Sequence, residues 1–247
     1  MTHEEHKLEE QVVSKAAEIT VSSQLDAAEK IDIDVETNFL EAIQGNAEGV
    51  MISGEGLVMQ KDVRVQEMEL HTDKIDINPL SVLFGHVELN QPIDANGRIV
   101  LTEPDINRAL NSNYVLGKAQ NFNLDVYGQT ATMAMQQMEL KLPGGNKMVF
   151  TGKVLLHEMG KTRQLGFTAT IHPRTRVQGV LVEGFHCHDG QTISIEFAAA
   201  LMHQLKQLVH LPYIEIEQMR IRVEEMEVQA GSITMQVQAH VNQLPSS

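Results

Sequence analysis

The sequence predicts an α+β fold in which one elongated, strongly curved antiparallel sheet packs on helices. Three observations lead to this expectation. Apolar and polar residues alternate over many short stretches, which is typical of strands with one buried face. Other stretches repeat apolar residues every three or four positions, as helices do. Hydrophobic residues make up 42% of the 247 residues, enough to form a packed core.

Most of the chain is predicted to be strands. Alternation starts at residues 31–35 and is seen last at residues 233–241. A turn at Pro143-Gly144-Gly145-Asn146 separates two of the strands in between. The alternation changes phase between Val65 and Met68, which predicts a β-bulge there.

Three helices are expected. The first covers Glu5–Ala28 and has a thin apolar stripe. The second starts at the capping residue Thr102 and ends at Leu110, with a proline and an aspartate in its first turn. The third runs from about Ser194 to Leu211, where Pro212 follows, and we expect it to be buried against the sheet. We assign residues 1–30 to an N-terminal amphipathic helix and residues 31–247 to a single domain.

The charge of the chain excludes a generic nucleic-acid binder. Nineteen Lys and Arg against 33 Asp and Glu give a formal net charge of −14. Residues 1–70 are strongly acidic, whereas residues 141–176 contain seven basic side chains and one acidic one. The basic segment predicts contact with an anionic partner such as a phospholipid surface, and a solvated hairpin that only offsets the acidic end is the alternative. The predicted contact residues are Lys147, Lys153, Lys161, Arg163, Arg174 and Arg176.

No motif predicts catalysis. The sequence His186-Cys187-His188-Asp189 places two imidazoles on one face of a strand, but a structural zinc site needs four ligands. Gly160-Lys161-Thr162 lacks the leading glycine of a phosphate-binding loop, because position 155 is Leu. We expect no enzyme activity, no metal and no cofactor. A metal-dependent enzyme that uses His186 and His188 is kept as an alternative.

The first ten residues do not predict export. They are polar and acidic, whereas a signal peptide has a basic start and an apolar stretch of at least about 7 residues. No apolar run approaches the roughly 20 residues of a membrane-spanning helix. The single cysteine, Cys187, excludes an intrachain disulfide and agrees with a reducing compartment. We expect a cytoplasmic protein that is peripheral to any membrane it contacts.

Four stretches, taken in order, resemble the LmeA-like phospholipid-binding proteins of bacteria. They are Val63–Leu70 with Ile75–Ile77, Leu80–Leu89, Leu101–Leu110, and an ending in which Leu211-Pro212 is followed by two strands around Gly231. The third is the most specific, since members carry a Leu-Thr-Glu-x-Asp-Leu-Asn type of helix start there. The resemblance covers roughly Gly54 to Val241. It departs from members acting in the cell envelope, which carry an export or anchor segment.

The resemblance implies a tubular lipid-binding type of fold, with long bent strands around a helix and an apolar groove. It also implies non-catalytic binding of a phospholipid or similar acyl lipid, for lipid transfer or membrane-surface sensing. Thirteen methionines suit such a ligand, because their side chains adapt to irregular apolar shapes. A scaffolding domain without a ligand is the alternative. The residues expected to line the groove are Leu83, Phe84, Leu110, Phe122, Met133, Met135, Phe167 and Met202.

Overall fold

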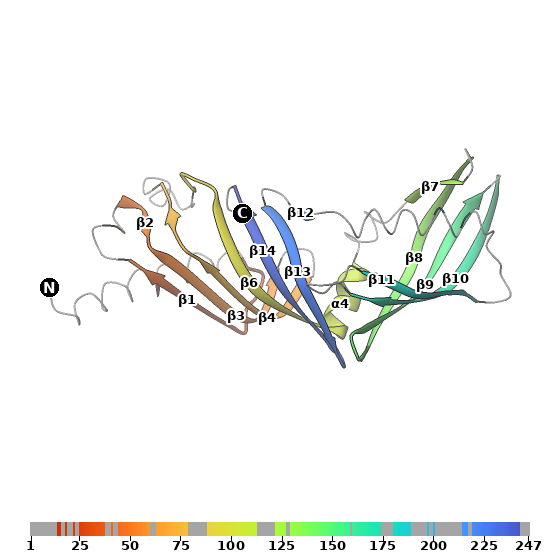
Figure 1. Cartoon of the computed structure of the whole chain (residues 1–247), viewed down its shortest axis with the longest axis horizontal. Coiled ribbons are helices and arrows are strands. Elements are labelled where there is room, and N and C mark those ends of the chain that lie inside the picture. The colour runs from red at the N-terminus through yellow and green to blue at the C-terminus, as the bar shows by residue number, and fades with distance from the viewer. Residues whose placement is uncertain are drawn as a thin grey trace.

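The computed structural model describes residues 14–15, 18, 22, 25–37, 41, 44–59, 63–78, 88–112, 122–126, 129–158, 160–173, 180–188, 197, 200, 214–216 and 219–242. Within these ranges the chain forms two large antiparallel sheets, a small two-stranded pair and one short helix. The two large sheets lie end to end along the longest axis of the molecule, and the helix lies where they meet (Figure 1).

The seven-stranded sheet combines strands from both ends of the chain. In spatial order its strands are β1 (Lys30–Glu36), β3 (Gly49–Met59), β4 (Val63–Thr72), β6 (Ile93–Thr102), β14 (Ser232–Val241), β13 (Met219–Gln229) and β12 (Ile214–Ile216). β6 pairs with β14, which joins the N-terminal and C-terminal groups of strands. The separate pair consists of β2 (Asn46–Ala47) and β5 (Ile75–Asp76).

The five-stranded sheet is a meander of consecutive antiparallel strands. In spatial order they are β11 (Leu181–Cys187), β10 (Lys161–His172), β9 (Lys147–Glu158), β8 (Gln129–Gly144) and β7 (Phe122–Val126). The β8–β9 turn is the predicted Pro-Gly-Gly-Asn sequence, in which Gly144, Gly145 and Asn146 have positive φ angles of 85°, 62° and 56°. Glycine and asparagine are the residues that adopt this conformation most readily, so the turn chemistry is present in the sequence.

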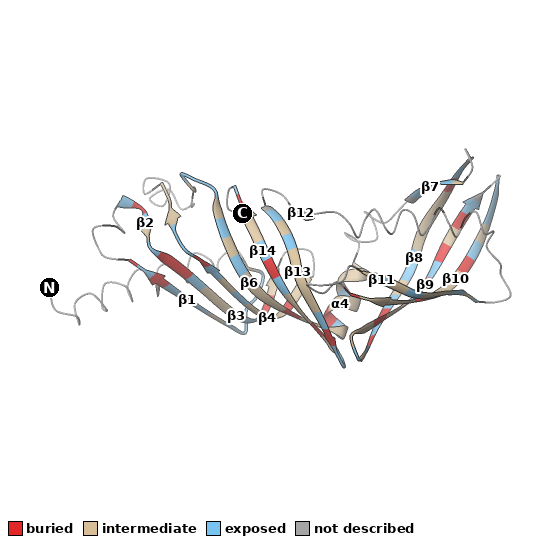
Figure 2. Cartoon of the chain, viewed as in Figure 1, coloured by how far each residue is buried: buried red, intermediate tan, exposed pale blue. Residues whose placement is uncertain are grey.

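One face of the five-stranded sheet is apolar. Residues that pair across antiparallel strands point to the same side of a sheet. The register therefore forms apolar rows, among them Met138, Gly152, Phe167 and Cys187, and Leu140, Phe150, Ala169 and Phe185. A register shift between Met135 and Gln137 keeps the apolar residues of β8 on one face, although they change from odd to even positions. Exposed and buried residues accordingly alternate over residues 139–143 of β8 and 151–154 of β9 (Figure 2).

The seven-stranded sheet has an apolar face of the same kind. Its middle row consists of Met68, Ile99, Met235 and Met226 on β4, β6, β14 and β13. All four are only partly buried. At the β1 end, Ile33, Val35 and Val50 are buried as a local cluster.

The predicted α+β class is wrong. The described chain is mostly β, with α4 (Glu103–Leu110) as its one complete helix, and the strands form two large sheets where one was expected. Alternation marks strands but carries no information about which strands pair. One sheet and two sheets therefore look the same in the sequence. The helices that supported the α+β class lie mainly outside the described residues.

Individual expectations have different outcomes. The short helix after Thr102 is confirmed, with Thr102 as its N-cap. The first helix was predicted to extend too far, because Ala27 forms a bridge with Val58. The bulge expected between Val65 and Met68 is wrong, since β3 and β4 keep one register throughout. Of the helix predicted at residues 194–211, only positions 197 and 200 are described, and Phe197 is fully buried against Ala131 and Leu156.

Candidate functional site

The two large sheets are connected at their hairpin tips. The Asn146 amide donates to the carbonyl of Val228 at 3.2 Å, and the side-chain oxygen of Asn146 accepts from the Val228 amide at 3.1 Å. The Gly231 amide donates to the carbonyl of Leu142 at 2.9 Å. The β8–β9 turn of one sheet thus lies directly against the β13–β14 turn of the other. We call this region the joint.

Helix α4 covers the edge of β8 at the joint. β7 pairs only with the first residues of β8, so side chains from α4 take the place of a strand farther along. The hydrogen bonds are Leu142 N to Glu103 Oε2 (2.6 Å), Leu140 N to Asn107 Oδ1 (2.7 Å), Asn107 Nδ2 to Leu140 O (2.8 Å) and Asn111 Nδ2 to Met138 O (2.8 Å). The spacings match, because four helical residues rise about 6 Å and two strand residues about 6.6 Å.

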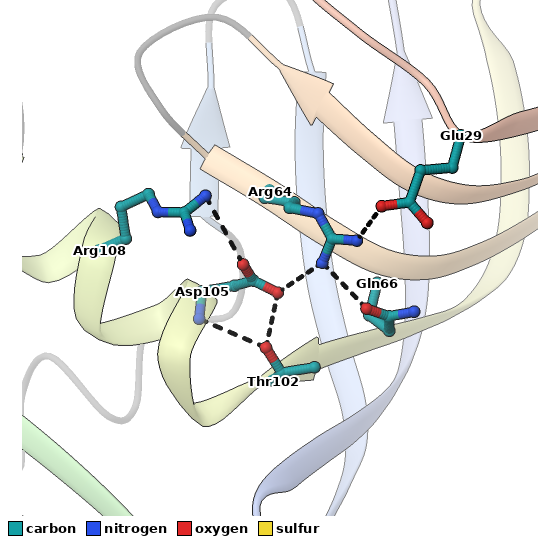
Figure 3. Close-up of polar contacts among 6 residues, drawn as sticks. All are labelled: Glu29, Arg64, Gln66, Thr102, Asp105 and Arg108. Carbon is teal, nitrogen blue, oxygen red and sulfur yellow. Dashed lines mark hydrogen bonds and ion pairs between the residues drawn. The ribbon is translucent and has the colours of Figure 1, made fainter.

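The opposite side of α4 is held to the seven-stranded sheet by an ion pair whose carboxylate is buried (Figure 3). Asp105 is 4% exposed and accepts from Arg64 of β4 at 2.9 Å and from the hydroxyl of Thr102 at 2.6 Å. Arg64 also donates to Glu29 at 2.6 Å and to Gln66 at 2.9 Å. Its hydrogen bonds, first to Glu29 and then to Asp105, raise the pKa of the Arg64 guanidinium.

An apolar cluster crosses the joint. The five-stranded sheet contributes Leu140, Leu142 and Met148, and the seven-stranded sheet contributes Val228 and Ile233. Partly buried residues of α4 and of both sheets pack around them: Ile106, Leu110, Phe150, Ile171, Met226 and Met235. The apolar faces of the two sheets are therefore continuous across the joint, and this continuous face is the candidate site.

Four of the predicted groove residues lie on or beside this continuous face. Met133 and Met135 lie on the apolar side of β8, and Met133 packs against the buried cluster at the far end of the sheet. Phe167 stacks on Phe185 with ring centroids 5.5 Å apart. Leu110 packs at the joint.

The structure does not describe the side chains of the other predicted groove residues. The backbone of Phe122 pairs with Met133, but its side chain is not among those described. Leu83, Phe84 and Met202 lie outside the described residues. The prediction missed the methionine row of the seven-stranded sheet, because nothing in one sequence shows that its strands pair in that register.

The basic segment does not form one compact group. Lys147 and Lys153 lie on the face of the five-stranded sheet opposite the apolar one. Lys161 follows the turn at the far end of β9, about 30 Å or more from Lys147 along the strands. Arg163 pairs with Leu156 and so belongs to a row of the apolar face. Arg174 and Arg176 lie outside the described residues.

The histidine and cysteine residues of β11 have ordinary structural surroundings. His186 and His188 are exposed, and His188 makes a hydrogen bond to the Thr168 hydroxyl at 2.6 Å. Burial raises the pKa of the Cys187 thiol, and the nearby charge of Arg163 opposes this. Within the described ranges, no three His, Cys, Asp or Glu side chains gather in a way that could hold a metal ion. The described part of the chain also contains no helix long and apolar enough to cross a membrane.

Comparison with known proteins confirms the resemblance seen in the sequence. A family model described as LmeA-like phospholipid-binding matches residues 6–238. The match covers most of the chain, so this chain belongs to that family. Neither the curated proteins nor the solved structures contain a significant match.

Proposed function

We propose that this member of the LmeA-like phospholipid-binding family holds its lipid on the continuous apolar face and transfers it between membranes without catalysing a reaction. The acyl chains lie along the rows of the two sheets and cross the joint. The family assignment supports a phospholipid as the ligand. The proposed lining includes the residues predicted from the sequence: Leu83, Phe84, Leu110, Phe122, Met133, Met135, Phe167 and Met202.

The observation that carries the proposal is the apolar cluster across the joint. Because Leu142 and Val228 belong to different sheets and share one buried cluster, the apolar faces form one long surface. Away from the joint, residues such as Met68, Met135 and Phe167 stay partly exposed on that surface. Partly exposed apolar side chains in rows can be covered by an acyl chain at a gain of roughly 25 cal/mol per Å².

Methionine suits this role. Met133, Met135 and Met138 lie on the apolar side of β8, and Met68, Met226 and Met235 lie in one row of the other sheet. Their unbranched side chains adjust to chains of different length and unsaturation at little cost. We infer binding of several acyl lipids with similar affinity.

Native mass spectrometry of the purified protein tests the proposal. We expect co-purified phospholipid in the parent protein and at least tenfold less in Met135→Glu, because a carboxylate on the apolar face opposes burial of an acyl chain. Gln137→Glu is the matched control. It adds the same charge to β8 on the opposite face, where Gln137 pairs with Lys153, and lipid should be retained.

Native mass spectrometry, together with assays of lipid transfer and lipid cleavage, separates the alternatives. A parent protein without lipid, which also fails to move fluorescent phospholipid between vesicles, supports a scaffolding domain. If the parent binds zinc and cleaves lipid, and His186→Ala loses both the zinc and the cleavage, a metal-dependent enzyme is supported. Lipid binding without transfer supports membrane-surface sensing. Equal lipid loss in Met135→Glu and Gln137→Glu contradicts the assignment of the apolar face.

A further inference from the structure

The second face of the five-stranded sheet collects imidazoles. Of the 11 histidines in the sequence, four lie on this face within the described part of the chain. They are His157 on β9, His172 on β10, His186 on β11 and His188 directly after β11. We call this surface, with its lysines Lys141, Lys147 and Lys153, the polar face.

The register fixes these positions. Lys153 pairs with Gly166, and the amide of His188 donates to the carbonyl of that glycine at 2.8 Å. In the neighbouring row, His186 pairs with Thr168. The hydroxyl of Thr168 also forms a 2.6 Å hydrogen bond with the His188 ring. These two histidines therefore lie close to each other and near Lys153. Both are exposed, as Lys153 is.

The other two histidines lie toward the two ends of the face. His157 is exposed and makes a hydrogen bond with the Thr162 hydroxyl at 2.8 Å. His172 lies at the end nearer the joint, 3.0 Å from Glu183, and Lys147 lies 3.1 Å from the same carboxylate. Imidazoles are thus spread along the whole face rather than confined to one corner.

The charge of the polar face depends on those imidazoles. The acidic groups that face them are Asp125 on β7, Glu139 on β8 and Glu183 on β11. They balance the three lysines, and Asp189, which follows His188, lies outside the described residues. Histidine is the side chain whose ordinary range places its charge change between neutral and mildly acidic pH.

We propose that the polar face docks on an anionic phospholipid membrane and that docking strengthens as the pH falls from 7.5 to 6.0. The proposal rests on the proposed function, since a lipid carrier must meet a membrane to load. Charge complementarity identifies the occupant. The strands of the seven-stranded sheet carry eleven acidic and five basic side chains, so an anionic surface repels that sheet and orients the molecule.

Flotation with two vesicle compositions tests the proposal. The vesicles are phosphatidylcholine alone and phosphatidylcholine with 30% phosphatidylserine, at pH 7.5 and 6.0 in buffer containing EDTA. The lower pH stays above the sequence pI of about 5.2, so the protein keeps a negative net charge. Each added charge near an anionic leaflet multiplies binding by about fivefold. We expect binding to anionic vesicles to rise at least tenfold at pH 6.0, and binding to neutral vesicles to stay unchanged.

Two double variants identify the face. His186→Gln/His188→Gln removes the central imidazoles and keeps an amide that can contact Thr168, and it should lose most of the gain at pH 6.0. His71→Gln/His240→Gln is the matched control in the seven-stranded sheet, where these histidines lie 3.3 Å from Asp73 and 2.7 Å from Asp94. The control should retain the full gain. Thermal unfolding of each variant confirms that it is folded.

The outcomes separate docking from lipid binding. A parent protein without the pH gain, or a gain that survives in His186→Gln/His188→Gln, overturns the docking proposal. If co-purified lipid is still present in that case, the proposed function stands without it. If docking shows the predicted pH gain but no lipid co-purifies, the docking surface is supported and the apolar-face proposal fails.

Discussion

The strands of the seven-stranded sheet carry eleven acidic and five basic side chains, whereas those of the five-stranded sheet carry four acidic and five basic ones. Their apolar faces do not differ in this way. Both present rows of Met, Leu, Ile and Val, to which the five-stranded sheet adds Phe, and both contribute to the cluster at the joint. The comparison teaches that one side of the molecule is mainly apolar along its length, as the proposed shared ligand requires, while the other side distinguishes its two ends by charge.

The sheets also differ in how they hold the helix between them. The seven-stranded sheet holds α4 through the ion pair between Arg64 and the buried Asp105, and through a hydrogen bond from the Glu103 amide to the Gly231 carbonyl. The five-stranded sheet holds it through hydrogen bonds to the edge of β8. Breaking an ion pair with a buried carboxylate costs more than losing the neutral hydrogen bonds that Asn107 and Asn111 make to β8. The joint should therefore be most sensitive on the side of the seven-stranded sheet.

The largest effect is expected from Asp105→Ala. The substitution removes the buried carboxylate, leaves Arg64 with Glu29 and Gln66 as its side-chain partners among the contacts described above, and takes away the acceptor of the Thr102 hydroxyl at the N-terminus of α4. We expect the free energy of unfolding to fall by about 3 kcal/mol, measured by urea denaturation. Asp105→Asn, which keeps an acceptor for Arg64 and Thr102, should cost clearly less.

Hydrogen exchange of the same variant tests whether the sheets form one cooperative unit. If the joint couples them, amide protection in both β4 and β9 should fall together. If only the seven-stranded sheet loses protection, the sheets are separately stable. The joint would then be a contact between two independent parts, and the idea of one continuous apolar face would be weakened.

The joint also shows what the sequence could and could not predict. Thr102, Pro104 and Asp105 predicted the start of α4, because capping is a local interaction. Alternation predicted most strands for the same reason. The pairing of β6 with β14, and with it the division into two sheets, depends on residues far apart in the chain. The charge pattern likewise carries no information about which face a basic residue occupies: Arg163 belongs to the basic segment in sequence but to the apolar face in register.

The next largest loss of stability is expected from alanine substitutions at two glycines, one in each large sheet. Gly97 on β6 lies beneath Leu70, and a Cβ there would be 2.7 Å from the carbonyl oxygen of Glu69. Gly152 on β9 lies beneath Phe167, and a Cβ would be 2.7 Å from its ring and 3.1 Å from the carbonyl oxygen of Gln137. We expect Gly97→Ala to cost about 2–3 kcal/mol and Gly152→Ala about 1–2 kcal/mol, since a ring can shift more easily than a backbone oxygen.

Gly184→Ala is the control for this pair. It lies in β11, and a Cβ there would meet only the His186 ring, at the ordinary distance of 3.4 Å. Its effect should stay within about 0.5 kcal/mol. Thermal unfolding of the three variants gives the order. If Gly152→Ala costs as much as Gly97→Ala, Phe167 is fixed in place, and the apolar face of the five-stranded sheet is less adaptable than a lipid site requires.

The smallest effect concerns Glu183 on the polar face. Hydrogen bonds from Lys147, and secondly from His172, lower the pKa of the Glu183 carboxyl below its usual value of 4.5. A folded-state pKa below the unfolded one stabilises the protein at a pH above the unfolded value, and this is lost as the pH falls through the folded value. Glu183→Gln should therefore be slightly less stable than the parent at pH 7, and the difference should vanish in acid.

NMR titration of the carboxyl carbon gives the direct measurement: Lys147→Gln should raise the Glu183 midpoint more than His172→Gln does. An unchanged midpoint in Lys147→Gln would mean that Lys147 does not stabilise the Glu183 carboxylate, so its charge would be available to an anionic membrane already at neutral pH.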